Sequence, residues 1–164
     1  MIILGLDPGL ASMGFGIISY DNVRPRMLDY GVLSTKPDQR LPQRLLYLFE
    51  GIGDLISRYE PDDVALEELF FNTNVSTAIN VGQARGVALT ASVLHTQNIY
   101  EYTPPQIKQA VAGYGRADKL QVQHMVKMLL GMDRLPKPDD AADALAVAIC
   151  HAHSLRMREN FRIK

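Results

Sequence analysis

The spacing of apolar residues changes once along the chain, and this change restricts the possible folds more than any other feature. Three short segments near the N-terminus, residues 1–7, 13–20 and 26–34, have the continuous or alternating apolar pattern of strands, and Pro-Gly and Asp-Asn turn signals separate them. Strands joined by connections this short normally pair in opposite directions. The N-terminal part of the sequence therefore predicts a three-stranded antiparallel meander.

Beyond residue 40 the apolar residues recur at helical spacing. Residues 41–59 predict an amphipathic helix that Pro61 ends, and residues 63–68 predict a buried fourth strand. A strand–helix–strand connection of this length normally makes its second strand parallel to a neighbour. Residues 75–97 predict a second long helix, and residues 99–103 predict a fifth strand.

Three more helices are expected in the C-terminal third, over residues 104–111, 119–131 and 138–157. The sequence therefore predicts an α/β fold with a mixed five-stranded sheet, an antiparallel meander plus parallel strands, flanked by helices. We expect residues 1–155 to form a single domain and residues 156–164 to form a basic, flexible C-terminal tail.

Composition excludes several classes of protein. Among 164 residues there is one cysteine, Cys150, so neither an intrachain disulfide nor a cysteine-rich metal site can form. The N-terminus has no cationic leader, and Asp7 and Pro8 interrupt its apolar run, so we expect no signal peptide. No apolar stretch is long enough to span a bilayer, so we expect a cytoplasmic protein without a membrane partner.

Charge is unevenly distributed although the net charge is only −1. Residues 1–100 carry 7 Lys and Arg against 11 Asp and Glu, whereas residues 101–164 carry 10 against 7. The basic excess of the second half is suited to facing a polyanion such as a nucleic acid. A solvated surface explains the asymmetry nearly as well.

Several carboxylates lie next to apolar segments, where an ionised side chain would need a cation to compensate its charge. Asp7 ends the first strand and Glu67 ends the apolar run of the fourth. The last helix is apolar, yet its first turns carry Asp140 and Asp143, three residues apart on one face, and Asp139, four residues before Asp143. An ionised carboxylate in a dry interior is costly unless a cation or hydrogen-bond donors meet it. If this helix crosses the sheet near strands one and four, the acids converge into a site for a hard divalent cation such as Mg²⁺.

Each acid also has a purely structural interpretation. Asp7 precedes Pro-Gly and is a plausible turn residue, and Glu67 can face solvent at a strand end. Asp139 can cap the last helix, and Asp140 is favoured in its first turn. Asp143 is the hardest to explain in this way because its neighbours are apolar.

Five segments, in this order, resemble the RuvC family of bacterial Holliday-junction resolvases over roughly residues 1–153. They read LGLDPGLASMGFGII, VALEELFF, NVGQARGVALTA, QIKQAVAGYGRADKLQVQHMV and DDAADALAVAICHAH. A single motif such as DPG is weak, since actin-like kinases share it, but five in order are specific. The resemblance implies an RNase H-like fold and a homodimeric endonuclease that nicks two opposed strands of a four-way DNA junction. It also implies dependence on Mg²⁺ or Mn²⁺, with one or two ions per subunit, and a partnership with the branch-migration motor complex of RuvA and RuvB.

The resemblance assigns roles to individual residues. It implies that Asp7, Glu67, Asp140 and Asp143 are the catalytic, metal-binding acids, which leaves Asp139 as a cap or a group outside the metal's own ligands. The same motifs imply two lysines near the scissile phosphate. They also imply an aromatic residue that would stack on an unpaired base. These are Lys108, Lys119 and Phe70. Weaker candidates for DNA contacts are Arg85, Tyr114 and Arg116.

Small residues recur every fourth position on the second long helix, at Ala78, Gly82 and Gly86. This row permits close packing either on the sheet or against a second subunit. We favour a dimer interface, because two symmetric cuts need two active sites and the family's dimer contact involves this helix.

Other functions remain open at this point. The chain could be an RNase H-like nuclease that acts on another structured nucleic acid, or a module that binds branched DNA without cutting it. A phosphotransferase of the sugar-kinase type would need a second lobe, for which 164 residues leave little room. None of the four histidines is assigned a role in the chemistry.

Overall fold

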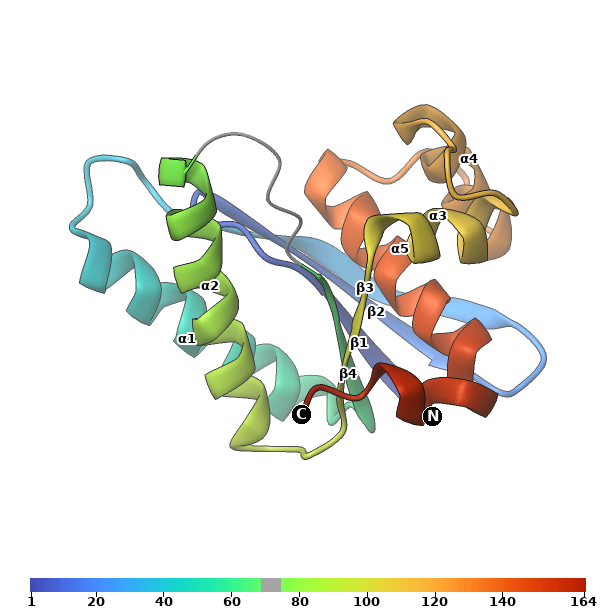
Figure 1. The fold of residues 1–164 in the computed structure, drawn as a ribbon, viewed down its shortest axis with the longest axis horizontal. Helices are drawn as coiled ribbons and strands as arrows, with labels where there is room; N and C mark the ends of the chain where they lie inside the picture. The colour runs from blue at the N-terminus through green and yellow to red at the C-terminus, as the bar shows by residue number, and fades with distance from the viewer. Residues whose placement is uncertain (69–74) are drawn as a thin grey trace.

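A mixed five-stranded sheet forms the centre of the computed structural model, which describes residues 1–68 and 75–164 (Figure 1). Its strands are β1 (Ile2–Asp7), β2 (Ser12–Tyr20), β3 (Pro25–Ser34), β4 (Asp63–Glu67) and β5 (Ile99–Tyr102). The order across the sheet is β3-β2-β1-β4-β5, with β1–β2 and β2–β3 antiparallel and β1–β4 and β4–β5 parallel. The predicted meander with added parallel strands is therefore confirmed.

Helices cover both faces of the sheet. One face carries α1 (Leu41–Tyr59) and α2 (Val75–Val93); the other carries α3 (Pro104–Ala112), α4 (Lys119–Leu129) and α5 (Asp139–Ser154), after which η1 (Leu155–Phe161) is a 3₁₀ helix. Helix α2 ends at Val93, before the predicted residue 97, and in the turn that follows the carbonyl of Ser92 accepts hydrogen bonds from the amides of His95 and Thr96. Within the described ranges, no helix combines the length and apolarity needed to cross a membrane.

Successive residues of each central strand enter opposite cores, as the pleat of a strand requires. On β1, Ile3 packs on the α5 side and Leu4 packs on the α1–α2 side. Both side chains are at most 1% exposed. The sheet is thus buried on both faces, which is why its central strands read as continuous apolar runs.

Glycines let α5 lie directly on the sheet. A Cβ added at Gly14 of β2 would stand 2.0 Å from the carbonyl oxygen of Asp140, and one at Gly5 of β1 would stand 2.3 Å from that of Ala144. Gly16 faces α5 one turn further along in the same way. Because only glycine permits this approach, the three residues set the depth of α5 and hold its N-terminal end beside the carboxyl end of β1.

Residues within the C-terminal segment 156–164 contact the sheet and the loop before β5. Arg162 forms an isolated antiparallel bridge with Tyr100, and its guanidinium donates to the carbonyl oxygen of Gln97 at 2.8 Å. Arg158 donates to the buried carboxylate of Asp63 at 2.7 Å. Two of the tail's basic side chains therefore contact the protein itself, while the flexibility expected of this segment stays a prediction.

Candidate functional site

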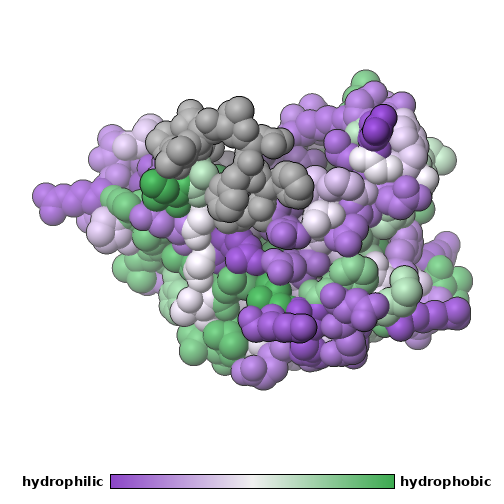
Figure 2. Space-filling model, in the orientation of Figure 1, coloured by the Kyte–Doolittle hydropathy of each residue, from purple (hydrophilic) through white to green (hydrophobic). Residues whose placement is uncertain are grey.

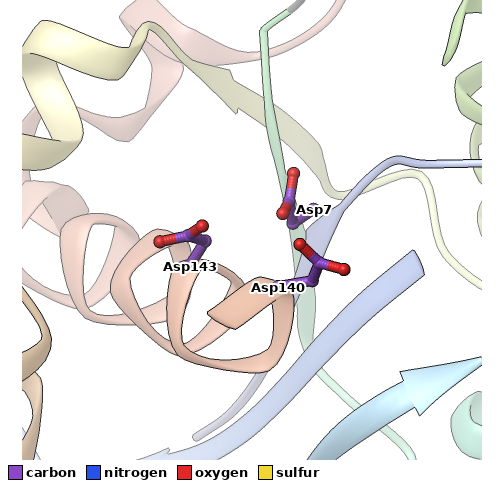
Figure 3. A group of neighbouring side chains, drawn as sticks. All are labelled: Asp7, Asp140 and Asp143. Carbon is purple, nitrogen blue, oxygen red and sulfur yellow. The ribbon is translucent and has the colours of Figure 1, made fainter. Parts of the chain in front are cut away.

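Three carboxylates converge where β1 ends and α5 begins (Figure 3). Asp7, Asp140 and Asp143 each offer an oxygen, and these oxygens all lie within 4.8 Å of one another. The arrangement follows from the fold, because the close packing of α5 on Gly14 and Gly5 brings its first two turns to the end of β1. The predicted convergence of these three acids is therefore present in the structure.

The fourth predicted acid, Glu67, borders the same region without joining the group of three. It ends β4, whose parallel pairing with β1 places Leu66 opposite Leu6, so Glu67 stands beside Asp7 at one edge of the sheet. Together with Asp143 and two lysines, Lys108 and Lys119, it lines a pocket of about 260 Å³. The pocket adjoins the acid group because Asp143 belongs to both.

The acids resist ionisation. Burial, followed by the charges of Glu67, Asp143 and Asp140, raises the pKa of Asp7 to about 8. Burial and then the charge of Asp143 raise the pKa of Glu67 to about 7, and burial also raises the pKa of Asp143 although Lys119 opposes it. These carboxylates cannot all be charged near neutral pH unless more positive charge arrives.

A divalent cation matches this requirement. The group offers carboxylate oxygens only, which are the ligands that hard cations such as Mg²⁺ prefer, and it has no cysteine or histidine that would favour a softer metal. A cation placed among the three oxygens would offset the burial and the repulsion that raise the pKa values of Asp7 and Asp143. The donor set therefore fits a divalent metal centre.

Lysine side chains supply the positive charge at the edge of the acid group. Lys119 begins α4 directly after the N-cap Asp118, and its Nζ lies 3.1 Å from Oδ2 of Asp143 and 3.4 Å from Oδ2 of Asp139. Burial lowers the pKa of Lys119, but the hydrogen bond and charge of Asp143, followed by Asp139, outweigh it, so the pKa is raised. Lys108 on α3 is partly buried in the pocket, where its charge acts on Glu67.

The remaining DNA-contact candidates are placed less uniformly. Arg116 and Tyr114 are exposed in the loop between α3 and α4, next to the pocket's lysines in sequence, and the Tyr114 hydroxyl donates to Gln121. Arg85 on α2 is partly buried and forms an ion pair with Glu101 of β5. Phe70 lies outside the described residues.

The row of small residues on α2 does not face the sheet throughout. Gly86 is exposed, and a Cβ added there would meet no atom within 4 Å. Ala78 and Gly82 are partly buried. The core side of the helix is instead formed by other alanines, namely Ala84, Ala88 and Ala91. At Gly86 the row is therefore available to another molecule.

Hydrophobic surface gathers on the side of the molecule occupied by α2, near both ends of the helix (Figure 2). Ile79 is 56% exposed, and Leu94, just beyond the helix, is 66% exposed.

Sequence reasoning missed a second polar cluster, at the opposite end of α5. His151 is fully buried; its Nε2 lies 2.8 Å from Oδ2 of Asp63 and its Nδ1 lies 2.8 Å from the hydroxyl of Tyr102. Arg158 reaches the same oxygen of Asp63. Because 88 residues separate His151 from Asp63, only an aspartate opening a buried strand could have signalled the pair in sequence.

Sheet order and site together define a class of protein. In this structure the antiparallel strands β1–β3 are followed by the parallel strands β4 and β5. Acids stand at the ends of β1 and β4, and further acids lie on α5, which crosses the sheet. This combination is the architecture of the RNase H-like nucleases. Within this class, the family model described as crossover junction endodeoxyribonuclease RuvC matches residues 3–151. The chain belongs to the RuvC family, as the sequence motifs indicate.

Relatives and solved structures agree with this assignment. Proteins described as crossover junction endodeoxyribonuclease RuvC from Alkaliphilus metalliredigens and Alkaliphilus oremlandii are 55% and 57% identical to the chain, with all of both chains covered. The structure of T. thermophilus RuvC in complex with a Holliday junction substrate has a TM-score of 0.91, with 36% identity and 96% of each chain covered.

Proposed function

We propose that this protein is a structure-selective endonuclease that resolves four-way DNA junctions by paired symmetric nicks, in homologous recombination and DNA repair. The observation that carries the proposal is the convergence of three carboxylates, with Glu67 and two lysines beside them, in a member of the RuvC family. The DNA bound in the related T. thermophilus structure supports a junction as the substrate.

Asp7, Asp140 and Asp143 would hold Mg²⁺, for which Mn²⁺ can substitute, and Glu67 would complete the acidic set. When bound, the cation supplies a water nucleophile at neutral pH and stabilises charge on the leaving oxygen during phosphodiester hydrolysis. Without the cation, Asp7 and Glu67 hold protons more readily than ordinary carboxylates, as their raised pKa values indicate.

Lys108 and Lys119 would orient the scissile phosphate. Both line the pocket between α3, α4 and α5, so their ammonium groups face the place where a DNA backbone would approach the acids. A lysine is a point charge for a phosphate oxygen and stabilises the extra negative charge of the transition state. Arg116 and Tyr114 would extend the contact along the strand, with Phe70 stacking on an unpaired base near the cut.

Two cuts related by symmetry require two active sites at a fixed separation, so we propose a homodimer with a twofold axis. Its interface would include α2, where Gly86 is open to close approach and Ile79 exposes apolar surface. Cooperation with a RuvA and RuvB motor complex is proposed from family resemblance.

Cleavage of a synthetic junction tests the proposal. The purified protein is mixed with a four-way junction or a matched linear duplex, with Mg²⁺ or with EDTA, and the products are mapped on denaturing gels. We expect paired nicks near the branch point on the junction, in Mg²⁺ only. Cutting of linear DNA or structured RNA instead would transfer the activity to another substrate. Tight junction binding without nicks in Mg²⁺ or Mn²⁺ would make the protein a binding module.

A further inference from the structure

Asp139 is the one acid at the start of α5 to which the proposed chemistry assigns no role. We propose that Asp139 is a positioning residue: fixed by Gln123 of α4, it holds the ammonium group of Lys119 beside the acid group. This inference rests on the proposed function, in which Lys119 orients the scissile phosphate.

The two oxygens of Asp139 have different partners. Oδ1 accepts a hydrogen bond from Nε2 of Gln123 at 2.9 Å, and Gln123 is only 4% exposed, so its amide is held by the packing of α4 on α5. Oδ2 lies 3.4 Å from Nζ of Lys119. Asp139 therefore connects the buried amide of Gln123 to the long side chain of Lys119.

Lys119 contacts two carboxylates on the same face of α5. Its Nζ is 3.1 Å from Oδ2 of Asp143, and Asp139 precedes Asp143 by four residues, one helical turn. A single exposed ion pair holds a lysine weakly, because fixing the side chain costs entropy and water screens the charges. Two carboxylates, one of them anchored by Gln123, define the position of the ammonium group more narrowly.

The second carboxylate is needed because Asp143 is also assigned to the metal centre. When Asp143 shares its charge with a cation, its attraction for Lys119 falls. Asp139 does not belong to the group of three, so its contacts with Gln123 and Lys119 need not change when a cation binds there. It can then keep Lys119 beside the reacting phosphate.

Lys137 provides a matched control. Its Nζ lies 3.5 Å from Oδ1 of Asp139, the oxygen that Lys119 does not use, and its side chain is 71% exposed. Replacing Lys137 changes the charge around Asp139 without touching Lys119 or the acid group.

The test measures single-turnover cleavage of a junction by the intact protein in saturating Mg²⁺. We expect Asp139→Asn to lower the cleavage rate about tenfold at unchanged junction affinity, because a misplaced catalytic group slows the chemical step. Asp139→Glu should restore part of the rate, and Lys137→Gln should match the wild type. In a Lys119→Gln background, Asp139→Asn should have no further effect, because Asp139 acts through Lys119. An equal loss in both backgrounds, or a wild-type rate for Asp139→Asn, would overturn the proposal.

A second measurement does not depend on cleavage. The order parameter of the Lys119 ammonium, measured by ¹⁵N side-chain NMR on the metal-free protein, should fall in Asp139→Asn and stay unchanged in Lys137→Gln. If the wild type fails to cut any junction, the proposed function fails while this measurement still tests the positioning role. An ammonium as ordered in Asp139→Asn as in the wild type would contradict that role.

Discussion

Carboxylates meet at both ends of α5, partly buried at the N-terminal end and fully buried at the C-terminal end, and their partners differ. At the N-terminal end, Asp140 and Asp143 meet Asp7 from β1, and Lys119 is the cation that contacts Asp143. At the C-terminal end, Asp63, only 1% exposed, meets both His151 and Arg158.

The difference separates a structural site from a functional one. At the N-terminal end Asp7 and Asp143 have raised pKa values, because burial, followed by repulsion from the neighbouring acids, exceeds the compensation that Lys119 offers. At the C-terminal end the chain provides its own partners for the carboxylate. A buried acid that the fold has already paired needs no cation from outside, whereas acids left in excess of the nearby positive charge require one.

Replacing Asp7 should have the largest effect at the N-terminal end. Asp7→Asn keeps the shape of the side chain but removes a metal ligand, so we expect junction cleavage to fall by about 10³-fold or more, which corresponds to ~4 kcal/mol of transition-state stabilisation. Junction affinity should change little, because basic side chains and DNA shape provide binding. Gel-based cleavage and binding assays check both, with the exposed Asp38→Asn as control. Rapid cutting by Asp7→Asn would remove Asp7 from the site.

The stability of the metal-free protein should depend on pH through the same acid. The pKa of Asp7 rises from its ordinary 3.8 to about 8 on folding, so the folded state favours the protonated form. Its contribution to stability is complete below pH 4 and is lost as the pH rises toward 8, by a few kcal/mol at about 1.4 kcal/mol per pKa unit. Urea unfolding at pH 5 and pH 8 in EDTA measures the loss.

Mg²⁺ should recover much of that stability at pH 8, because a bound cation replaces the proton. Asp7→Asn should show a smaller pH dependence and a smaller response to Mg²⁺ than the wild type. Equal responses in both proteins would mean that the acid group neither titrates nor binds the cation as described.

The third-largest effect is expected from moving the N-terminal end of α5 away from the sheet, which should lower both stability and the cleavage rate. In Gly14→Ala the new methyl group would stand 2.0 Å from the carbonyl oxygen of Asp140, so the first turn of α5 must shift. We expect a loss of about 3 kcal/mol in the free energy of unfolding and slower cleavage by the folded protein.

Gly53→Ala on α1 is the matched control, because a Cβ there meets no atom within 4 Å. It should be neutral or stabilising by up to about 1 kcal/mol, since alanine favours a helix more than glycine does. Wild-type stability for Gly14→Ala, measured in the same urea titration, would show that α5 is not held by this contact.

Breaking the C-terminal end should change stability alone. His151→Leu removes the hydrogen bonds to Asp63 and Tyr102, and we expect it to lower the free energy of unfolding by about 2 kcal/mol. The cleavage rate per folded molecule should stay at the wild-type value. His153→Leu, an exposed histidine two residues on, should have little effect in either assay. A cleavage defect in folded His151→Leu would show that the C-terminal cluster also affects catalysis, and it would contradict the assignment of that cluster to stability alone.

Much of this protein can be predicted from sequence because local patterns carry it. The change from strand to helical spacing identifies all five strands, and the short early connections indicate their antiparallel pairing. Asp7 and Glu67 are recognisable because they end apolar strands, and Asp143 because it interrupts an apolar helix. Residue spacing alone does not decide which of the three aspartates on α5 bind the metal, and the family motifs select Asp140 and Asp143 over Asp139.

The features that could not be predicted from sequence depend on contacts between distant segments of the chain. The pairing of Lys119 with Asp139 and Asp143 depends on how α4 packs on α5, and the approach of α5 depends on glycines of β1 and β2. His151 and Asp63 meet across 88 residues, and Arg158 joins them from beyond the end of the helix. Residue spacing along one strand or helix determines which side chains share a face, but it contains no information on which other face will meet them. The sequence therefore identifies the acids, and the packing of α5 on the sheet and against α4 determines which of them converge and which of them Lys119 contacts.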